Sequence, residues 1–229
     1  MRDICLAYGI PLLSGKDSMY VDGHLPGAFG ERHKVSGLPT MQFTTTTVVP
    51  DILNCPSMEC KIAGDLVYLL GTTANELGGS EYYDLLGYVG LNAPKLKPQT
   101  VLPLYRALEQ SISAGLIASC HGIYRGGLAI HAALVALGSH LGLTLDLAKV
   151  PVDGPLRDDQ ILFSESCGRF LVTVDPTKQQ PFEALFLGLP FALAGEVTSD
   201  RRLVILGKEG NALLAESLPR LKRSRKQTE

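Results

Sequence analysis

The stretch IASCHGIYRGGLAIHAALVAL, residues 117–137, decides how the rest of the chain is interpreted. An apolar run comes first, a glycine-containing loop follows, and the stretch ends in alanine and leucine. This order predicts a strand, a tight loop and a helix. Gly126 and Gly127 let the backbone approach a ligand closely, and the first turn of a helix presents unpaired N–H groups at the positive end of its dipole. The loop between this strand and this helix is therefore either a simple tight turn or an anion site. A glycine pair by itself does not distinguish the two.

Composition places the chain among ordinary α/β proteins. Its 229 residues are enough to bury a sizeable core, and 45% are hydrophobic while 19% are charged. A net charge of −2 gives no reason to expect nucleic acid or an anionic membrane surface as a partner. No apolar run reaches the length of a membrane helix. The five cysteines are odd in number, which argues against a disulfide framework and favours free thiols in the cytoplasm.

Two further loops combine small residues with charges. In SGKDSM, residues 14–19, Lys16 and backbone N–H groups could contact a phosphate, or Asp17 a cation. The P-loop spacing is missing, and a solvated turn explains the loop equally well. The second loop, residues 76–84, follows the apolar run LVYLLG, and Ser80 is predicted to cap a helix over residues 81–86.

Periodicity predicts the other elements. Helices are expected over residues 1–8, 101–116, 176–189 and 212–221, and residues 20–40 are expected to form a loop. Strands are expected over residues 43–49, 66–71, 143–147, 161–164, 170–174, 191–197 and 203–206. Their order predicts an α/β (α+β) fold, a mixed sheet with helices on one face. His131 is expected to face solvent.

Charged groups outside these loops are ambiguous. Asp153, Asp158 and Asp159 either bind a divalent cation or are simply solvated, because their spacing is not that of an EF-hand. Glu165 and Arg169 are expected to pair with each other or to hold the loops around them.

Five motifs, taken together and in this order, resemble a known family. They are SGKDSM (14–19), GDLVYLLG (64–71), ELGGSEYYD (76–84), HGIYRGGL (121–128) and FSESCGRFLVTV (163–174). The family is that of the phosphoribosylformylglycinamidine synthases, within the aminoimidazole ribonucleotide synthetase-like superfamily. The resemblance is to the C-terminal half of these enzymes and covers roughly residues 1–210.

The resemblance implies three parts. Residues 1–60 are the end of an N-type domain, which in the family forms a β-barrel with its partner. Residues 61–215 form the C-type α/β domain, and residues 216–229 a basic tail. In the family, nucleotide and magnesium bind where the domain types meet. ATP activates an amide oxygen, and ammonia from a glutaminase subunit then displaces the phosphate. The implied partners are that subunit and the N-terminal half of the synthase.

One loop departs from the family pattern His-Asp-x-Ser-Asp-Gly-Gly-Leu. Gly122, Tyr124 and Arg125 replace Asp, Ser and Asp, so that hard-cation ligands are lost. Arg125 instead repels a metal ion and attracts a phosphate. No metal ligand is therefore predicted, and no catalytic residue is predicted because the resemblance places the family's catalytic residues in the missing first half. The predicted contacts for ATP, ADP or phosphate, expected to converge on one cleft, are Lys16, Asp17, Ser18, Gly78, Gly79, Ser80, His121, Arg125, Gly126 and Gly127.

Three functions remain open at this point. The first is a portion of the synthase that contributes a scaffold and a nucleotide or phosphate pocket and is inactive alone, since the first half of the family sequence is missing. The second is a structural or assembly module whose pocket has lapsed, with a homodimer formed through the strand at residues 43–49. The third is a kinase of the same superfamily, such as thiamine-monophosphate kinase, which needs metal-binding aspartates of its own.

Overall fold

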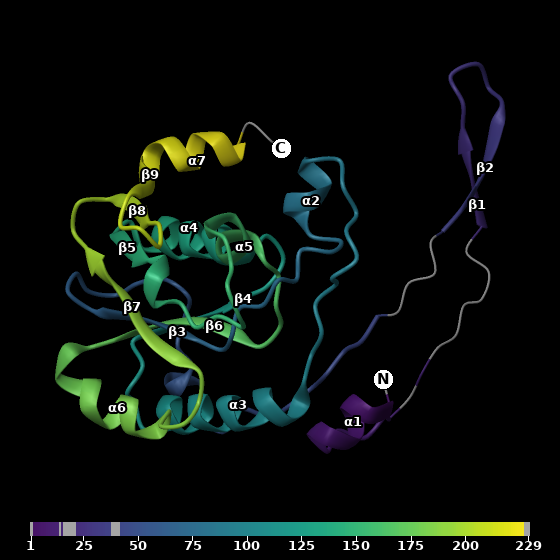
Figure 1. The fold of residues 1–229 in the computed structure, drawn as a ribbon. Helices are drawn as coiled ribbons and strands as arrows, with labels where there is room; N and C mark the ends of the chain where they lie inside the picture. The colour runs from purple at the N-terminus through teal and green to yellow at the C-terminus, as the bar shows by residue number, and fades with distance from the viewer. Residues whose placement is uncertain (1, 14, 16–21, 38–41, 227–229) are drawn as a thin grey trace. The chain divides into compact units, whose positions relative to one another are not determined.

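The computed structural model describes residues 2–13, 15, 22–37 and 42–226 (Figure 1). The chain divides into two units, residues 1–52 and residues 53–229. No helix in these described ranges is long and apolar enough to cross a membrane.

The first unit holds little regular structure. It contains helix α1 (Arg2–Tyr8) and an antiparallel hairpin of β1 (Asp22–Pro26) and β2 (Arg32–Ser36). The expectation of a loop was therefore wrong for the hairpin, whose tight turn is made possible by Gly30 at φ +85°. All ten strand residues are exposed, so the hairpin contributes no core.

The prediction of a strand at residues 43–49 was wrong. These residues form neither helix nor strand, and Phe43 and Val48 are exposed. β-branched residues favour strands chiefly through packing on a neighbouring strand, and no described segment pairs with this one. The dimer edge expected here therefore has no strand to support it.

The second unit is built on a seven-stranded sheet in the order β4-β6-β3-β7-β5-β8-β9. Neighbouring strands are antiparallel except β5 and β8, which are parallel. The mixed α/β class is thus confirmed. The strands are β3 (Leu66–Leu70), β4 (Ser119–Ile123), β5 (Gly142–Asp146), β6 (Arg169–Val174), β7 (Phe191–Thr198), β8 (Arg202–Leu206) and β9 (Ala212–Ser217).

Strand β3 shows why the sheet is covered on both faces. Val67 and Leu69 point into one apolar cluster, which includes residues of α4, while Tyr68 and Leu70 point into a second, which includes residues of α3 and α6. All four are at most 3% exposed, and burying a side chain of this size contributes about 1.5–3 kcal/mol. The helices therefore lie on both faces and not, as expected, on one (Figure 1).

The helices surround this sheet. They are α2 (Glu81–Leu85), α3 (Pro98–Ser113), α4 (Gly127–Ser139), α5 (Asp158–Phe163), α6 (Gln179–Leu185) and α7 (Leu218–Lys226), with short 3₁₀ turns at Ile52–Asn54, Leu147–Lys149 and Pro176–Lys178. The predicted strand–loop–helix order at residues 117–137 is confirmed by β4 and α4.

Two further predicted elements were wrong. Residues 161–164 belong largely to helix α5, since two acidic residues occupy its first turn and Gln160 Oε1 accepts from Arg157 N at 2.9 Å. Residues 212–217 form β9 and not a helix, because β8 offers them a strand to pair with; the helix begins only at Leu218.

Candidate functional site

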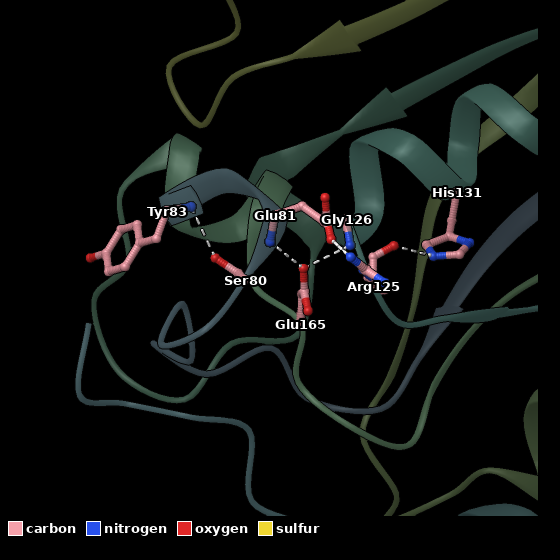
Figure 2. A network of polar contacts seen from close by, with 7 residues as sticks. All are labelled: Ser80, Glu81, Tyr83, Arg125, Gly126, His131 and Glu165. Carbon is pink, nitrogen blue, oxygen red and sulfur yellow. Dashed lines mark hydrogen bonds and ion pairs between the residues drawn. The ribbon is translucent and has the colours of Figure 1, made fainter. Parts of the chain in front are cut away.

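Two loops that are far apart in the sequence meet at one carboxylate. Oε1 of Glu165 accepts hydrogen bonds from the backbone N of Glu81 at 2.9 Å and from that of Gly126 at 2.8 Å (Figure 2). These N–H groups belong to the first residue of α2 and the residue before α4. We call this arrangement of Glu81, Gly126 and Glu165 the corner.

Local sequence holds the α2 side of the corner in place. Ser80 Oγ accepts from Tyr83 N at 3.2 Å, as expected for the predicted N-cap, and donates to the Leu77 carbonyl at 2.7 Å. A Cβ at Gly78 would lie 2.7 Å from the backbone N of Ala93, so only glycine fits there. The Gly78–Ser80 loop thus fixes the direction of the Glu81 N–H.

The α4 side of the corner depends on left-handed backbone. Gly126 has φ +91° and Gly127 has φ +74°. A Cβ at Gly127 would lie 2.6 Å from the Leu162 carbonyl oxygen. Glycines are therefore required for the close approach of α4 to α5 that aims the Gly126 N–H at Glu165.

Arg125 lies beside the corner but is not a free cation. Its guanidinium is ion-paired with Oε1 of Glu81, and the two side chains are 78% and 47% exposed (Figure 2). An incoming phosphate has to compete with Glu81 for Arg125 and with Glu165 for the backbone N–H groups. The corner thus has the donors expected for an anion, and two carboxylates of the chain use them.

Glu165 and Arg169 do not pair with each other; each holds a different loop, which was the second of the two expectations. Arg169 is 3% exposed and donates from Nη1 to Thr73 Oγ1, from Nη2 to the Ser164 carbonyl and from Nε to the Ser166 carbonyl. Burial lowers the pKa of this guanidinium to about 10. Arg169 is therefore charged at neutral pH, and each of its three nitrogens donates to a protein oxygen.

His121 and His131 form a pair that the sequence did not predict. His121 Nε2 lies 2.8 Å from His131 Nδ1, and His131 Nε2 lies 3.1 Å from the Arg125 carbonyl oxygen. The expectation that His131 faces solvent was wrong, because it is 1% exposed and packs against Tyr124. Burial lowers the pKa of both histidines.

The loop between β4 and α4 does not fit a magnesium ion. The segment from Gly122 to Gly127 contains no carboxylate, and the Arg125 guanidinium repels cations. In the ranges that the structure describes, no group of three or more His, Cys, Asp or Glu side chains could hold a metal ion. The predicted contacts Lys16, Asp17 and Ser18 lie outside the described residues.

A cavity of about 300 Å³ lies next to this region, and sequence reasoning missed it. Lys95 and Lys97, just before α3, line it together with Cys167 and Gly168. The segment 164–169 therefore reaches the corner through Glu165 and the cavity through Cys167. Two lysines a few residues before a predicted helix were the available sequence signal.

Comparison with known proteins agrees with this fold. The family described as "AIR synthase related protein, C-terminal domain" matches residues 63–208. The phosphoribosylformylglycinamidine synthase subunit PurL of Thermococcus sibiricus is 30% identical over 223 residues, which are 97% of this chain and 29% of that protein. The chain thus spans less than a third of that relative's length.

Solved structures of PurL from Thermotoga maritima share the fold. The one complexed with FGAR superposes with a TM-score of 0.70 at 16% identity and covers 96% of this chain and 36% of that chain. The one complexed with ATP gives a TM-score of 0.61 at 19% identity, with 73% and 27% covered.

Proposed function

Because the chain belongs to the AIR synthase-related family through a C-terminal domain at residues 63–208, we propose that it is the C-terminal portion of a phosphoribosylformylglycinamidine synthase. The observation that carries this proposal is the 30% identity to a PurL subunit over 97% of the chain. The whole enzyme is an ATP-dependent ligase of purine biosynthesis. This portion contributes a scaffold and a phosphate-binding corner and does not catalyse the reaction alone.

At the corner, a phosphate group of ATP or ADP replaces Glu165. The N–H groups of Glu81 and Gly126 point at one position and already hold a negatively charged oxygen there, at 2.9 and 2.8 Å. A phosphate oxygen makes the same charge-assisted hydrogen bonds. The Arg125 guanidinium then leaves the Glu81 carboxylate and pairs with the phosphate. Related T. maritima PurL structures complexed with ATP, ADP and AMPPCP support a nucleotide as the ligand class.

The partners in this proposal are the remaining portion of the synthase and a glutaminase subunit, in the cytoplasm. A solved PurLQS assembly from Thermotoga maritima supports assembly with other subunits. The five cysteines are all free thiols, in keeping with a reducing compartment.

Calorimetric titration of the chain with ATP tests the corner. Binding is expected to persist when EDTA removes magnesium, because no carboxylate of the β4–α4 loop serves as a metal ligand. Arg125→Asp is expected to weaken binding at least tenfold, since it places a negative charge beside the corner. The control Arg106→Asp changes an exposed arginine of α3 and is expected to leave the affinity unchanged. Loss of binding in EDTA contradicts the proposal.

The position of Glu165 favours a second candidate, an assembly module whose pocket has lapsed. Glu165→Ala removes the carboxylate that holds both N–H groups. If the corner binds phosphate, this variant is expected to gain affinity for inorganic phosphate, whereas the control Glu109→Ala on α3 is not. A Glu165→Ala chain that folds and still binds no phosphate or nucleotide leaves only the assembly module.

Turnover separates the same two candidates at the level of the whole enzyme. Mixed with the complementary portion of a PurL relative, the chain is expected to restore ATP-dependent conversion of the amide substrate with ammonia. The chain without that portion is expected to show none. Turnover by the isolated chain contradicts the proposal.

A further inference from the structure

In the histidine pair, the donor and the acceptor of each hydrogen bond can be assigned. A carbonyl oxygen only accepts, so His131 Nε2, 3.1 Å from the Arg125 carbonyl, carries a proton. A neutral imidazole has a single N–H, so His131 Nδ1 accepts. The proton of the 2.8 Å contact therefore belongs to His121 Nε2, and His121 Nδ1 is left with a lone pair.

The surroundings keep both rings neutral and fixed. Burial lowers the pKa of His121 and of His131. The charged groups that act on His131 are Arg169, which lowers its pKa, and Glu165, which raises it. The Tyr124 ring lies 4.2 Å from the His131 ring and 6.0 Å from the His121 ring, measured between centroids. No residue in the described part of the chain donates a hydrogen bond to His121 Nδ1.

We propose that His121 and His131 form a proton-accepting dyad beside the corner, in which His121 receives a proton from a ligand O–H or N–H group and His131 positions it. The ligand X–H bond breaks, its electron pair stays on X, and the proton binds His121 Nδ1. The proton on His121 Nε2 passes to His131 Nδ1. The positive charge then rests on His131, whose Nε2–H still donates to the Arg125 carbonyl.

The dyad sets the chemical class of the ligand group. A lone pair on His121 Nδ1 repels the oxygens of an ionised phosphate and attracts a hydroxyl, amine or amide donor. The inference rests on the proposed function in one respect, the position of the ligand, whose phosphate lies at the corner and whose N–H or O–H group points toward His121. The assignment of donors and acceptors in the histidine pair applies to the free chain. It can therefore be tested independently of nucleotide binding.

Nitrogen-15 NMR of the imidazoles in the full chain, without nucleotide, tests the dyad. His121 is expected as the Nε2–H tautomer, and the first protonation on acidification is expected to shift the nitrogens of both rings at one apparent pKa. Finding the Nδ1–H tautomer at His121, or two rings that titrate independently, overturns the proposal. This measurement needs no variant.

Two variants separate positioning from simple packing. In His131→Asn an amide oxygen replaces the Nδ1 acceptor, so His121 is expected to keep its tautomer but to take up its proton alone and at lower pH. In His131→Leu the acceptor is gone, and a mixture of tautomers is expected. A titration of His121 that neither variant changes overturns the role of His131.

Access to the lone pair is tested with diethyl pyrocarbonate, which modifies unprotonated imidazole. His121 is expected to be modified at pH 7 and His131 to be protected, as read by peptide mass spectrometry. Modification is expected to slow at lower pH along the first protonation of the pair. A wild-type His121 that remains unmodified overturns the assignment of Nδ1 to a ligand.

Discussion

The hexapeptide SESCGR, residues 164–169, contains two charged residues, Glu165 and Arg169. Glu165 lies at the corner and Arg169 lies in the buried interior, and the two side chains have opposite roles. Arg169 is buried and donates to two carbonyls of the hexapeptide itself and to the hydroxyl of Thr73 on another loop. Glu165 is only partly buried and bridges two backbone N–H groups. A buried guanidinium whose three nitrogens all donate to protein atoms offers little to a ligand, whereas a carboxylate at a water-accessible corner can be replaced by another anion.

The two side chains differ in what can satisfy their hydrogen-bonding partners once the side chain is removed. Removing Arg169 leaves buried acceptors that water reaches poorly, and such groups cost about 1–3 kcal/mol each. Removing Glu165 leaves two N–H groups that solvent or a phosphate satisfies. We therefore assign a structural role to the Arg169 region and an exchangeable one to the corner, and the following variants test this comparison.

The largest effect is expected at the structural region. Arg169→Met keeps the apolar stem but loses three hydrogen bonds, and the free energy of unfolding is expected to fall by about 3 kcal/mol or more. Urea denaturation measures the change. Arg106→Met, at an exposed position of α3, is the control and is expected to leave stability unchanged. A loss below 1 kcal/mol at Arg169 would remove the distinction between the regions.

The next largest effect concerns the backbone that forms the corner. Gly127→Ala places a Cβ 2.6 Å from the Leu162 carbonyl at φ +74°, and a loss of about 2 kcal/mol is expected. Gly122→Ala is a matched control in the preceding strand, because the nearest atom to its Cβ is a Tyr124 ring carbon at 3.6 Å. Thermal unfolding of both variants makes the comparison; equal midpoints would show that α4 can shift away from α5.

A smaller effect is expected for the carboxylate itself. Glu165→Ala loses two charge-assisted hydrogen bonds at a solvent-accessible corner, and about 1.5 kcal/mol of stability is expected to be lost. Added phosphate is expected to recover part of this loss by binding the folded state. Urea midpoints with and without phosphate measure both effects. A phosphate response equal to that of Glu109→Ala counts against an exchangeable corner.

The smallest effect is expected at the exposed ion pair. Arg125→Ala removes the partner of Glu81, and because both side chains are largely solvated the expected change is about 0.5 kcal/mol or less. The change is expected to shrink further in 1 M salt. A loss above 2 kcal/mol in urea denaturation would place Arg125 with Arg169 among the structural residues.

Much of the second unit follows from local patterns. The continuous apolar run at Leu66–Leu70 predicted a buried strand, and Ser80 predicted the start of α2; the structure has both. Where only short-range propensity was available, as at residues 43–49 and 161–164, the predictions were wrong. A short apolar or β-branched run becomes a strand only if a neighbour pairs with it, and sequence spacing does not reveal the neighbour.

By itself, the sequence determined the family and the mixed α/β class. It also indicated the need for glycines at the two loops of the corner. Each of these depends on short patterns of residue types along the chain. Only the tertiary structure decided that Glu165 occupies the corner, that Glu81 neutralises Arg125 and that His131 is buried against His121. These contacts join residues that are 10 to 84 positions apart. Such pairs are set by how helices pack on the sheet, and no local pattern in the chain encodes that packing.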